Sequence, residues 1–197
     1  MVIGGPGGAM ALGLDAAGDI LTLPACAEFS PSGQAAASVT PAAITASSHS
    51  GAAAFLPSGQ FVVATALGVA RHDVDVQVQR VNAGGSVAST SPSFDYSGAS
   101  GLDQARDTVS AVAIQANGSA VAGGTHFLST SVFGLARVNA SGSLDTTFGN
   151  AGTLTTSIQG GDSAGALVIQ PDGKILAVGT SQNSTGQVDV ALVRYLG

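Results

Sequence analysis

The sequence predicts an all-β protein built from tandem repeats, and three observations support this fold class. First, Val109–Thr125 reads VSAVAIQANGSAVAGGT, and Ala164–Thr180, 55 positions later, reads AGALVIQPDGKILAVGT. Second, Glu28 is the only glutamate and Lys174 the only lysine, whereas Val, Thr, Ser and Gly, which favour strands and turns, are abundant. Third, the clearest repeat, from Val109 to about Ser157, carries no apolar stripe at the 3.6-residue spacing of an amphipathic helix.

The repeat extends along the chain in four copies. Gly51–Ala66 has the same pattern around Gly59, and Ala9–Leu23 has it more faintly around Gly18. A recurring unit of this length indicates supersecondary units that stack on one another or surround an axis. We therefore divide one repeat domain, residues 1–197, into approximate repeats 1–50, 51–105, 106–160 and 161–197. The first is degenerate, and the last is expected to lack a fourth strand.

The clearest repeat predicts four short strands joined by turns. Asn117-Gly118 lies between two apolar runs, and this dipeptide is a strong hairpin signal because both residues tolerate positive φ. A second turn is expected around Gly142. The expected strands are Val109–Gln115, Ala120–Thr125, Val132–Asn139 and Gly152–Ser157.

The strands of the last repeat do not alternate between apolar and polar residues. Ala166–Ile169 and Ile175–Val178 are continuous apolar runs, which indicate a sheet covered on both faces. Small sheets covered on both faces and repeated in tandem are typical of blades packed around an axis. We predict a β-propeller or partial propeller of four blade-like repeats, each a small antiparallel four-stranded sheet. A β-solenoid is the second choice, because its coils usually have shorter periods and need no paired hairpin turns.

Two segments resemble a known family of repeats. Phe133–Gly149 (FGLARVNASGSLDTTFG) is similar to the core of the delta-60 repeat, and Gln170–Gly179 (QPDGKILAVG) resembles the start of its next copy. The resemblance implies a β-propeller fold in a bacterial protein, and it implies an extracellular or cell-surface location because many such proteins are exported. It implies no particular reaction, since the family has no established activity.

The two ends of the chain bear on whether such a ring closes. Met1-Val2-Ile3 precedes two glycines, as does Ser157-Ile158-Gln159 where a fourth strand ends, so the N-terminus could complete the last blade. A fragment of a larger ring is the alternative. The first basic residue is Arg71, so the apolar N-terminus lacks the basic region of a secretory signal, and we expect no signal peptide in this chain.

Composition excludes several partners. The formal net charge is −6, and the six basic residues are scattered singly, so no basic patch for nucleic acid is expected. The longest largely apolar stretch, Phe61–Ala70, is too short to span a bilayer. Cys26 is the only cysteine, so it forms no disulfide within the chain. Leu23–Cys26 resembles a lipoprotein cleavage box, but it lies inside a repeat, and we interpret Cys26 as a structural thiol.

Two motifs suggest chemistry and have simpler interpretations. Gly161-Asp162-Ser163-Ala164-Gly165 matches the G-x-S-x-G nucleophile elbow, but it leads into a predicted strand instead of a helix, so we expect a loop. His72 lies beside Asp73 and Asp75, a grouping that could bind a metal or act in acid–base catalysis. Because Asp75 recurs as Asp189, we favour a structural role for it.

Other polar residues recur with the spacing of the repeat. Arg80, Arg137 and Arg194 occupy one repeat position, and we expect them to pair with carboxylates of neighbouring blades; binding an anionic ligand in a central channel is the alternative. Asn117, Asp145 and Asp172 are expected to stabilise turns. His49 and His126 have no partner pattern, and we place both in loops.

We therefore expect a non-catalytic binding or structural module of an exported bacterial protein, with a protein or a glycan as its partner. No residue is assigned a catalytic, cofactor-binding or metal-binding role, and no cofactor is expected. The alternative is a propeller enzyme with a metal-assisted hydrolytic site at the central channel, using His72, Asp73 or Asp75. Self-association through exposed sheet edges is a third hypothesis.

Overall fold

The structure, a computed structural model, describes residues 11–14, 20–23, 27–29, 35–38, 48–70, 73–83, 86–98 and 105–197. These residues form strands connected by turns and loops, and no helix occurs among them, which confirms the all-β prediction for this part of the chain. The described ranges accordingly contain no helix with the length and apolarity that crossing a bilayer requires.

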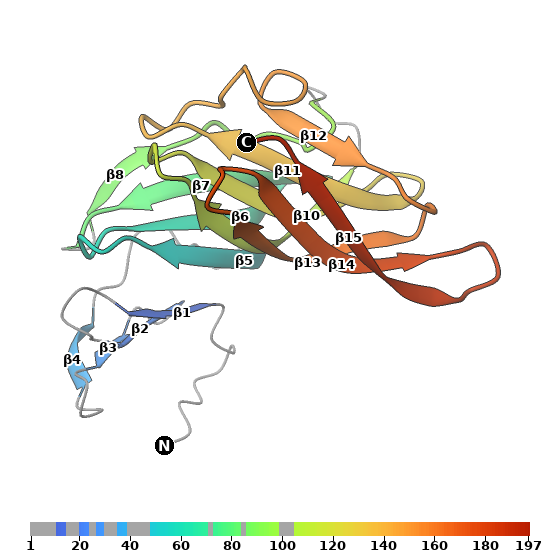
Figure 1. The fold of residues 1–197 in the computed structure, drawn as a ribbon. Helices are drawn as coiled ribbons and strands as arrows, with labels where there is room; N and C mark the ends of the chain where they lie inside the picture. Colours follow the sequence, from blue (N-terminus) through green and yellow to red (C-terminus); the bar gives the residue numbers. More distant parts are fainter. Residues whose placement is uncertain are drawn as a thin grey trace.

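The described residues hold fifteen strands, which follow one another in antiparallel meanders (Figure 1). The strands are β1 (Ala11–Leu14), β2 (Ile20–Leu23), β3 (Ala27–Phe29), β4 (Ala35–Ser38), β5 (Ser48–Phe55), β6 (Phe61–Ala70), β7 (Asp73–Val81), β8 (Val87–Thr90), β9 (Arg106–Ile114), β10 (Ala120–Phe127), β11 (Ser131–Val138), β12 (Thr153–Thr156), β13 (Asp162–Ile169), β14 (Ile175–Gln182) and β15 (Val188–Tyr195).

Chain order groups these strands into four sheets, which we call the first (β1–β4), second (β5–β8), third (β9–β12) and fourth (β13–β15) sheet. The second and third sheets are joined by one parallel pair, Val74 and Arg106, so β5–β12 also form one eight-stranded sheet, in which β8 pairs with β7 beside the main path. The fourth sheet has three strands. Within the described residues no strand of the fourth sheet pairs with the first sheet, so the sheets do not close into a ring.

The hairpin turns lie where the repeat glycines predict them. Gly59, Gly118 and Gly173 have φ of 79°, 84° and 84°, a region that favours glycine, and each amide donates to the carbonyl three residues earlier. These glycines turn β5 into β6, β9 into β10 and β13 into β14. In the clearest repeat, β9 starts three residues before the predicted strand, and β10, β11 and β12 overlap theirs.

The core lies between successive sheets, and alternate residues of one strand belong to different parts of it. In β10, Ala120 and Ala122 pack with Val62, Val76 and Val78 of the second sheet. Val121, between them, packs with Ile175 of the fourth sheet. The third sheet is therefore covered on both faces, as its apolar strands require.

The fourth sheet differs from the prediction, because its strands are apolar on both faces but only one face is covered. Ile175 and Ala177 are fully buried against the third sheet. Val168, which belongs to a run that predicts two covered faces, is 56% exposed. No described strand packs on that outer side.

Candidate functional site

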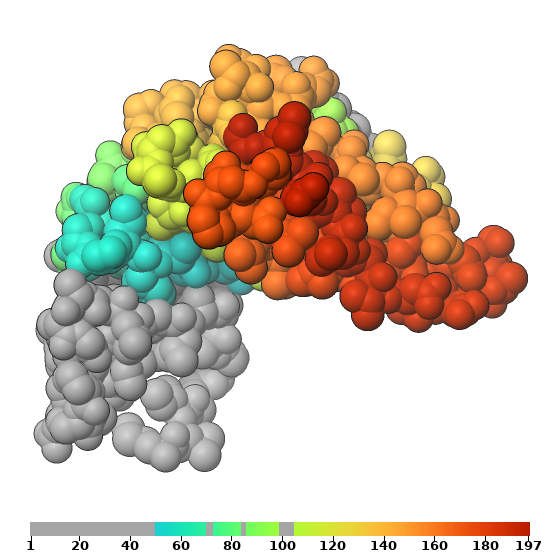
Figure 2. Space-filling view, viewed as in Figure 1, coloured from blue at the N-terminus to red at the C-terminus, as the bar shows by residue number. Residues whose placement is uncertain are grey.

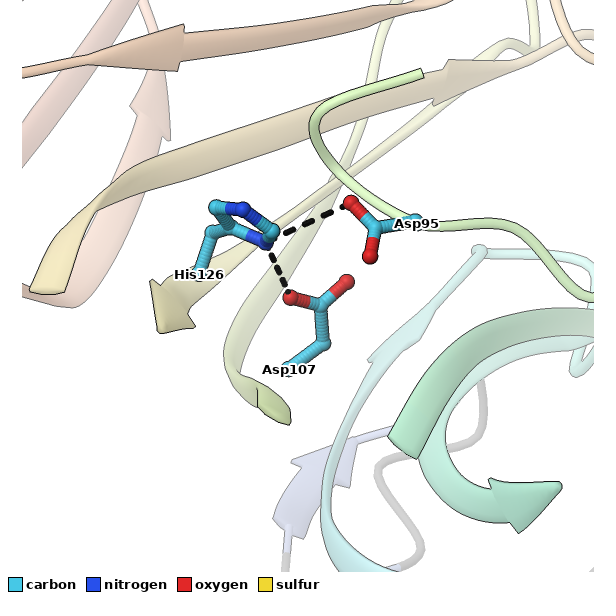
Figure 3. A group of neighbouring side chains, drawn as sticks. All are labelled: Asp95, Asp107 and His126. Atoms are coloured by element: carbon cyan, nitrogen blue, oxygen red, sulfur yellow. Dashed lines mark hydrogen bonds and ion pairs between the residues drawn. The ribbon is translucent and has the colours of Figure 1, made fainter. Parts of the chain in front are cut away.

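Two aspartates and a histidine meet in the interior, beside the third sheet (Figure 3). Asp107 is in β9, His126 is in β10, and Asp95 is in the segment that follows β8. Of the residues that the structure describes, these are the one set of three His, Cys, Asp or Glu side chains placed closely enough to share a metal ion, with one ligand atom from each within 4.8 Å of the others. We call this set the Asp–His corner.

Strand register and a short turn bring the three residues together. Asp107 and His126 are direct cross-strand partners in the antiparallel pair of β9 and β10, so their side chains leave the sheet on the same side. Phe94 forms an isolated bridge to Val76, which fixes the position of the next residue, Asp95. The Asp95 carboxylate then accepts a hydrogen bond of 2.6 Å from the amide of Ser97, as in an Asx turn.

The contacts within the Asp–His corner are short, and its three side chains are almost fully buried. Nδ1 of His126 lies 2.8 Å from Oδ1 of Asp107 and 3.3 Å from Oδ1 of Asp95. The side chains of Asp107, Asp95 and His126 are 0%, 4% and 9% exposed. Asp107 also accepts a 3.0 Å hydrogen bond from the amide of Tyr96. Oδ2 of Asp95 is buried and accepts no hydrogen bond from a described residue.

Burial sets the electrostatics of the Asp–His corner. It raises the pKa of Asp107 to about 6; the hydrogen bonds from His126 and Tyr96 oppose the rise, and the nearby Asp95 carboxylate adds to it. The pKa of the Tyr96 phenol is raised well above its usual value by burial and by the charge of Asp107. The two carboxylates beside one imidazole make the addition of a positive charge favourable. A proton on one of the three side chains or a bound cation could supply that charge.

The same register position recurs in the fourth sheet with different chemistry. Asp162 of β13 is the direct partner of Ser181 of β14, and both lie 55 residues after Asp107 and His126. Asp162 is fully buried and accepts hydrogen bonds of 2.5 Å from the Ser181 hydroxyl and 2.7 Å from the Ile158 amide. A third hydrogen bond, of 3.3 Å, comes from the amide of Gln159. We call this set the Asp–Ser corner.

Burial also acts on the Asp–Ser corner, but hydrogen bonding outweighs it. Burial raises the pKa of Asp162, whereas the hydrogen bonds from Ser181 and from the backbone around Ile158 lower it, so the net pKa is lowered. A buried aspartate in this register therefore ties the preceding loop to the start of its sheet. Asp107 does the same through Tyr96.

His126 corrects the sequence interpretation, which placed His49 and His126 in loops. Both lie in strands, β5 and β10, and His126 is buried against two carboxylates. The signal was present, since the aligned segments Val109–Thr125 and Ala164–Thr180 extend, in the same spacing, to Asp107 and Asp162 on one side and to His126 and Ser181 on the other. Asp95 has no such signal, because only the turn after Phe94 brings it to the corner.

The grouping around His72 is only partly described. His72 and Arg71 lie outside the described residues, as do Cys26 and Met1–Ile3. Asp73 is 1% exposed and Asp75 is half-buried, both in β7. Within the described ranges neither belongs to a set of three potential metal ligands.

The repeated arginines make two different contacts. Nη2 of Arg80 donates a 2.6 Å hydrogen bond to the Gly118 carbonyl of the next sheet, so its acceptor is backbone instead of the expected carboxylate. Nε of Arg137 lies 2.9 Å from Oδ2 of Asp145, a carboxylate of its own repeat, and its guanidinium lies 4.7 Å from the ring centre of Phe148. Arg194 is exposed.

The remaining motifs are structural. Ser163 of the G-x-S-x-G segment lies in strand β13, so the expected loop is wrong. Ser163 is exposed and hydrogen-bonded at 3.0 Å to the Thr125 hydroxyl, without the strand–turn–helix of a nucleophile elbow. The predicted turn residues do stabilise their turns: Asn117, Asp145 and Asp172 each accept a hydrogen bond from the amide two residues on.

The fold and the two corners define a class of protein, an all-β repeat protein whose blade-like sheets follow one another in chain order. Comparison with known families agrees with this class. Residues 115–148 and 170–196 match the family described as a domain of unknown function (DUF5122) beta-propeller. These segments are thus similar to β-propeller repeats, which confirms the resemblance to the delta-60 repeat. No curated protein matches the chain.

Proposed function

We propose that this protein is a non-catalytic β-propeller module of four blade-like repeats, with a binding or structural role. One observation carries the proposal: the buried aspartate of the Asp–His corner recurs in register in the Asp–Ser corner. Both carboxylates accept a hydrogen bond from the backbone of the loop that precedes their sheet. Because these carboxylates hold the preceding loop in two successive repeats, we assign them a role in stabilising each blade.

Exposure favours the same proposal. The carboxylates and imidazole of the Asp–His corner are at most 9% exposed, so a substrate has little access to them. A catalytic site needs its acid, base or metal within reach of the reacting atoms.

The second candidate function is a metal-assisted hydrolase, and the Asp–His corner is the observation that favours it. Asp95, Asp107 and His126 offer two carboxylate oxygens and an imidazole nitrogen within 4.8 Å of one another. Such a donor set suits Zn²⁺ or Mn²⁺, and a bound ion could activate water. The buried Oδ2 of Asp95, which accepts no hydrogen bond from a described residue, adds a further potential ligand atom.

A metal titration separates the two candidates. The free energy of unfolding of the full chain is measured with ZnCl₂, MnCl₂ or a chelator, for the natural sequence and for Asp107→Asn. A structural corner predicts the same stability in all conditions. A metal site predicts stabilisation of about 2.7 kcal/mol when the free metal is 100 times its dissociation constant. Stabilisation that disappears in Asp107→Asn would overturn the metal-free structural role of the Asp–His corner and favour the second candidate.

We place this module in an exported bacterial protein, at the cell surface or outside the cell. The support is the resemblance of Phe133–Gly149 and Gln170–Gly179 to delta-60 repeats. Fractionation of cells that express the complete natural gene tests this location. Recovery of the protein in the cytoplasm alone would contradict it.

A further inference from the structure

Arg80 of β7 carries a positive charge that no described carboxylate neutralises. Its guanidinium belongs to none of the ion pairs among the described residues, and its hydrogen bond of 2.6 Å goes to a neutral acceptor, the Gly118 carbonyl. A guanidinium has several N–H donors, so one carbonyl does not satisfy it. Because Arg80 is half-buried, solvent compensates its charge only in part, and an anion beside it is favoured.

The third sheet shows what the second lacks. There, Nε of the equivalent arginine, Arg137, lies 2.9 Å from Oδ2 of Asp145. Asp145 directly follows the bridge partner of Val138, and Ala88 directly follows the strand partner of Val81. The second repeat therefore has an alanine at the position of the aspartate that neutralises the arginine in the third.

A small hollow lies beside Arg80, between the second and third sheets. Arg80, Ser89 and Asn139 supply its polar side chains, and aliphatic side chains of both sheets, among them Val78 and Val138, form its apolar wall. No acidic side chain lines it. Its volume of about 10 Å³ gives room for about one water-sized species. In Figure 2 the green atoms of the second sheet adjoin the yellow-green and golden atoms of the third at this junction.

The side chains of Ser89 and Asn139 can both donate to a ligand in the hollow. Oδ1 of Asn139 accepts hydrogen bonds of 3.1 Å from the amides of Ser141 and Ser143, which leaves its Nδ2 group as the donor. Gly142 has a φ of 99°, and a Cβ there would lie 2.9 Å from Cβ of Ser89. A glycine at this position therefore lets the turn after β11 approach Ser89 closely.

From this arrangement we infer that the hollow binds a small inorganic anion of about the size of chloride. Arg80 supplies the charge, and Ser89 and Asn139 supply neutral donors from the second and third sheets. The anion takes the electrostatic role that Asp145 has beside Arg137, and it links the two sheets. A hollow of this volume does not admit sulfate or phosphate. This site goes beyond the proposed function and shares no residue with the Asp–His corner.

Urea denaturation of the full chain tests the inference, with sodium chloride replacing sodium gluconate at constant sodium concentration. Above the dissociation constant of chloride, the equilibrium constant of unfolding should fall about tenfold for each tenfold rise in chloride, because the anion binds only the folded protein. Arg80→Gln should abolish this dependence. Arg194→Gln is the matched control, since Arg194 occupies the same repeat position and is exposed, and it should keep the dependence.

Ala88→Asp keeps the inference testable if Arg80→Gln does not fold. Ala88 is exposed, and the new carboxylate should neutralise Arg80 as Asp145 neutralises Arg137, so the chloride dependence should again disappear. Crystals grown in sodium bromide should show anomalous scattering beside Arg80, Ser89 and Asn139.

Three results would overturn the inference: no chloride dependence in the natural sequence, a dependence that either variant retains, or bromide at other positions only. None of them would alter the metal titration of the Asp–His corner, so failure of the anion site is distinguishable from failure of the proposed function.

Discussion

The Asp–His and Asp–Ser corners occupy one register position in successive sheets, yet their buried carboxylates respond to burial in opposite ways. The pKa of Asp107 is raised to about 6, and that of Asp162 is lowered. Burial disfavours the charge in both corners. The difference comes from the number of donors: Asp162 accepts from a hydroxyl and from successive loop amides, whereas Asp107 has one amide, the imidazole and a second carboxylate beside it.

This contrast shows that successive repeats can have the same residue at the same position although the electrostatic environment of that residue differs. Asp162 is stabilised as an anion by the donors around it. Asp107 is an anion in an environment that favours its protonated form, and Asp95 contributes to that because its own carboxylate lies against the same imidazole. The two corners therefore should contribute unequally to stability and should respond oppositely to pH.

The largest expected difference comes from removing each carboxylate. Asp162→Ala should lower the free energy of unfolding by about 3 kcal/mol, because it leaves the buried hydroxyl of Ser181 and the partly buried amide of Ile158 without their acceptor. Asp107→Ala should cost only about 1 kcal/mol, since removal of an unfavourable charge offsets the lost hydrogen bonds. Urea denaturation at pH 7 measures both. Equal losses would show that the corners do not differ as proposed.

A second difference should appear in the pH dependence of stability. Asp107 has a folded pKa of about 6, above its unfolded value of about 4, so the folded protein binds its proton more tightly. Its contribution is therefore greatest below pH 4 and falls by about 1 to 3 kcal/mol as pH rises to 6. Asn does not titrate, so Asp107→Asn should remove this slope. Urea denaturation from pH 4 to 7 measures it.

Asp162 should give the opposite slope in the acid range. Its folded pKa is lowered, so its contribution is present above the unfolded pKa and is lost as pH falls through the folded pKa. Asp162→Asn should flatten the loss of stability at acid pH and leave the slope between pH 4 and 6 in place. A natural-sequence protein whose stability rises steadily from pH 4 to 6, with Asp107→Asn unchanged, would contradict the assignment for Asp107. An Asp162→Asn variant that loses stability at acid pH as steeply as the natural sequence would contradict the assignment for Asp162.

The smallest expected effect is at the contact that joins the two corners. The hydroxyls of Thr125, beside His126, and Ser163, beside Asp162, lie 3.0 Å apart in an exposed position. A double-mutant cycle with Thr125→Val and Ser163→Ala should give a coupling of about 0.5 kcal/mol, because water replaces an exposed hydrogen bond readily. A coupling several times larger would indicate that the corners act as one unit.

Much of the fold follows from local sequence. The 55-residue period gives the repeat, and Gly59, Gly118 and Gly173 give the hairpins, because a turn needs positive φ at these positions whatever surrounds it. The turn roles of Asn117, Asp145 and Asp172 were predictable for the same reason, since their partners are two residues away. The residues that form such a turn are close together in the chain, so a single sequence is enough to predict the turn.

The Asp–His corner could be predicted only in part. The spacing of Asp107 and Asp162, continued to His126 and Ser181, indicates a recurring cross-strand pair. Asp95 could not be found this way, because it reaches His126 through the bridge between Phe94 and Val76, a contact between segments 18 residues apart in the chain. Whether Asp107 carries its charge easily depends on that third residue.

The sequence by itself determined the all-β class, the repeat period and the apolar character of both faces of the fourth sheet. Only the tertiary structure decided that Phe133 and Leu135 are buried while Val190 and Leu192 are exposed, although all four are apolar and occupy equivalent positions. It also decided that Asp107 and Asp162 have opposite pKa shifts. The physical reason is the same in both cases: burial and electrostatics depend on what lies against a side chain, and the neighbours here come from other strands and loops.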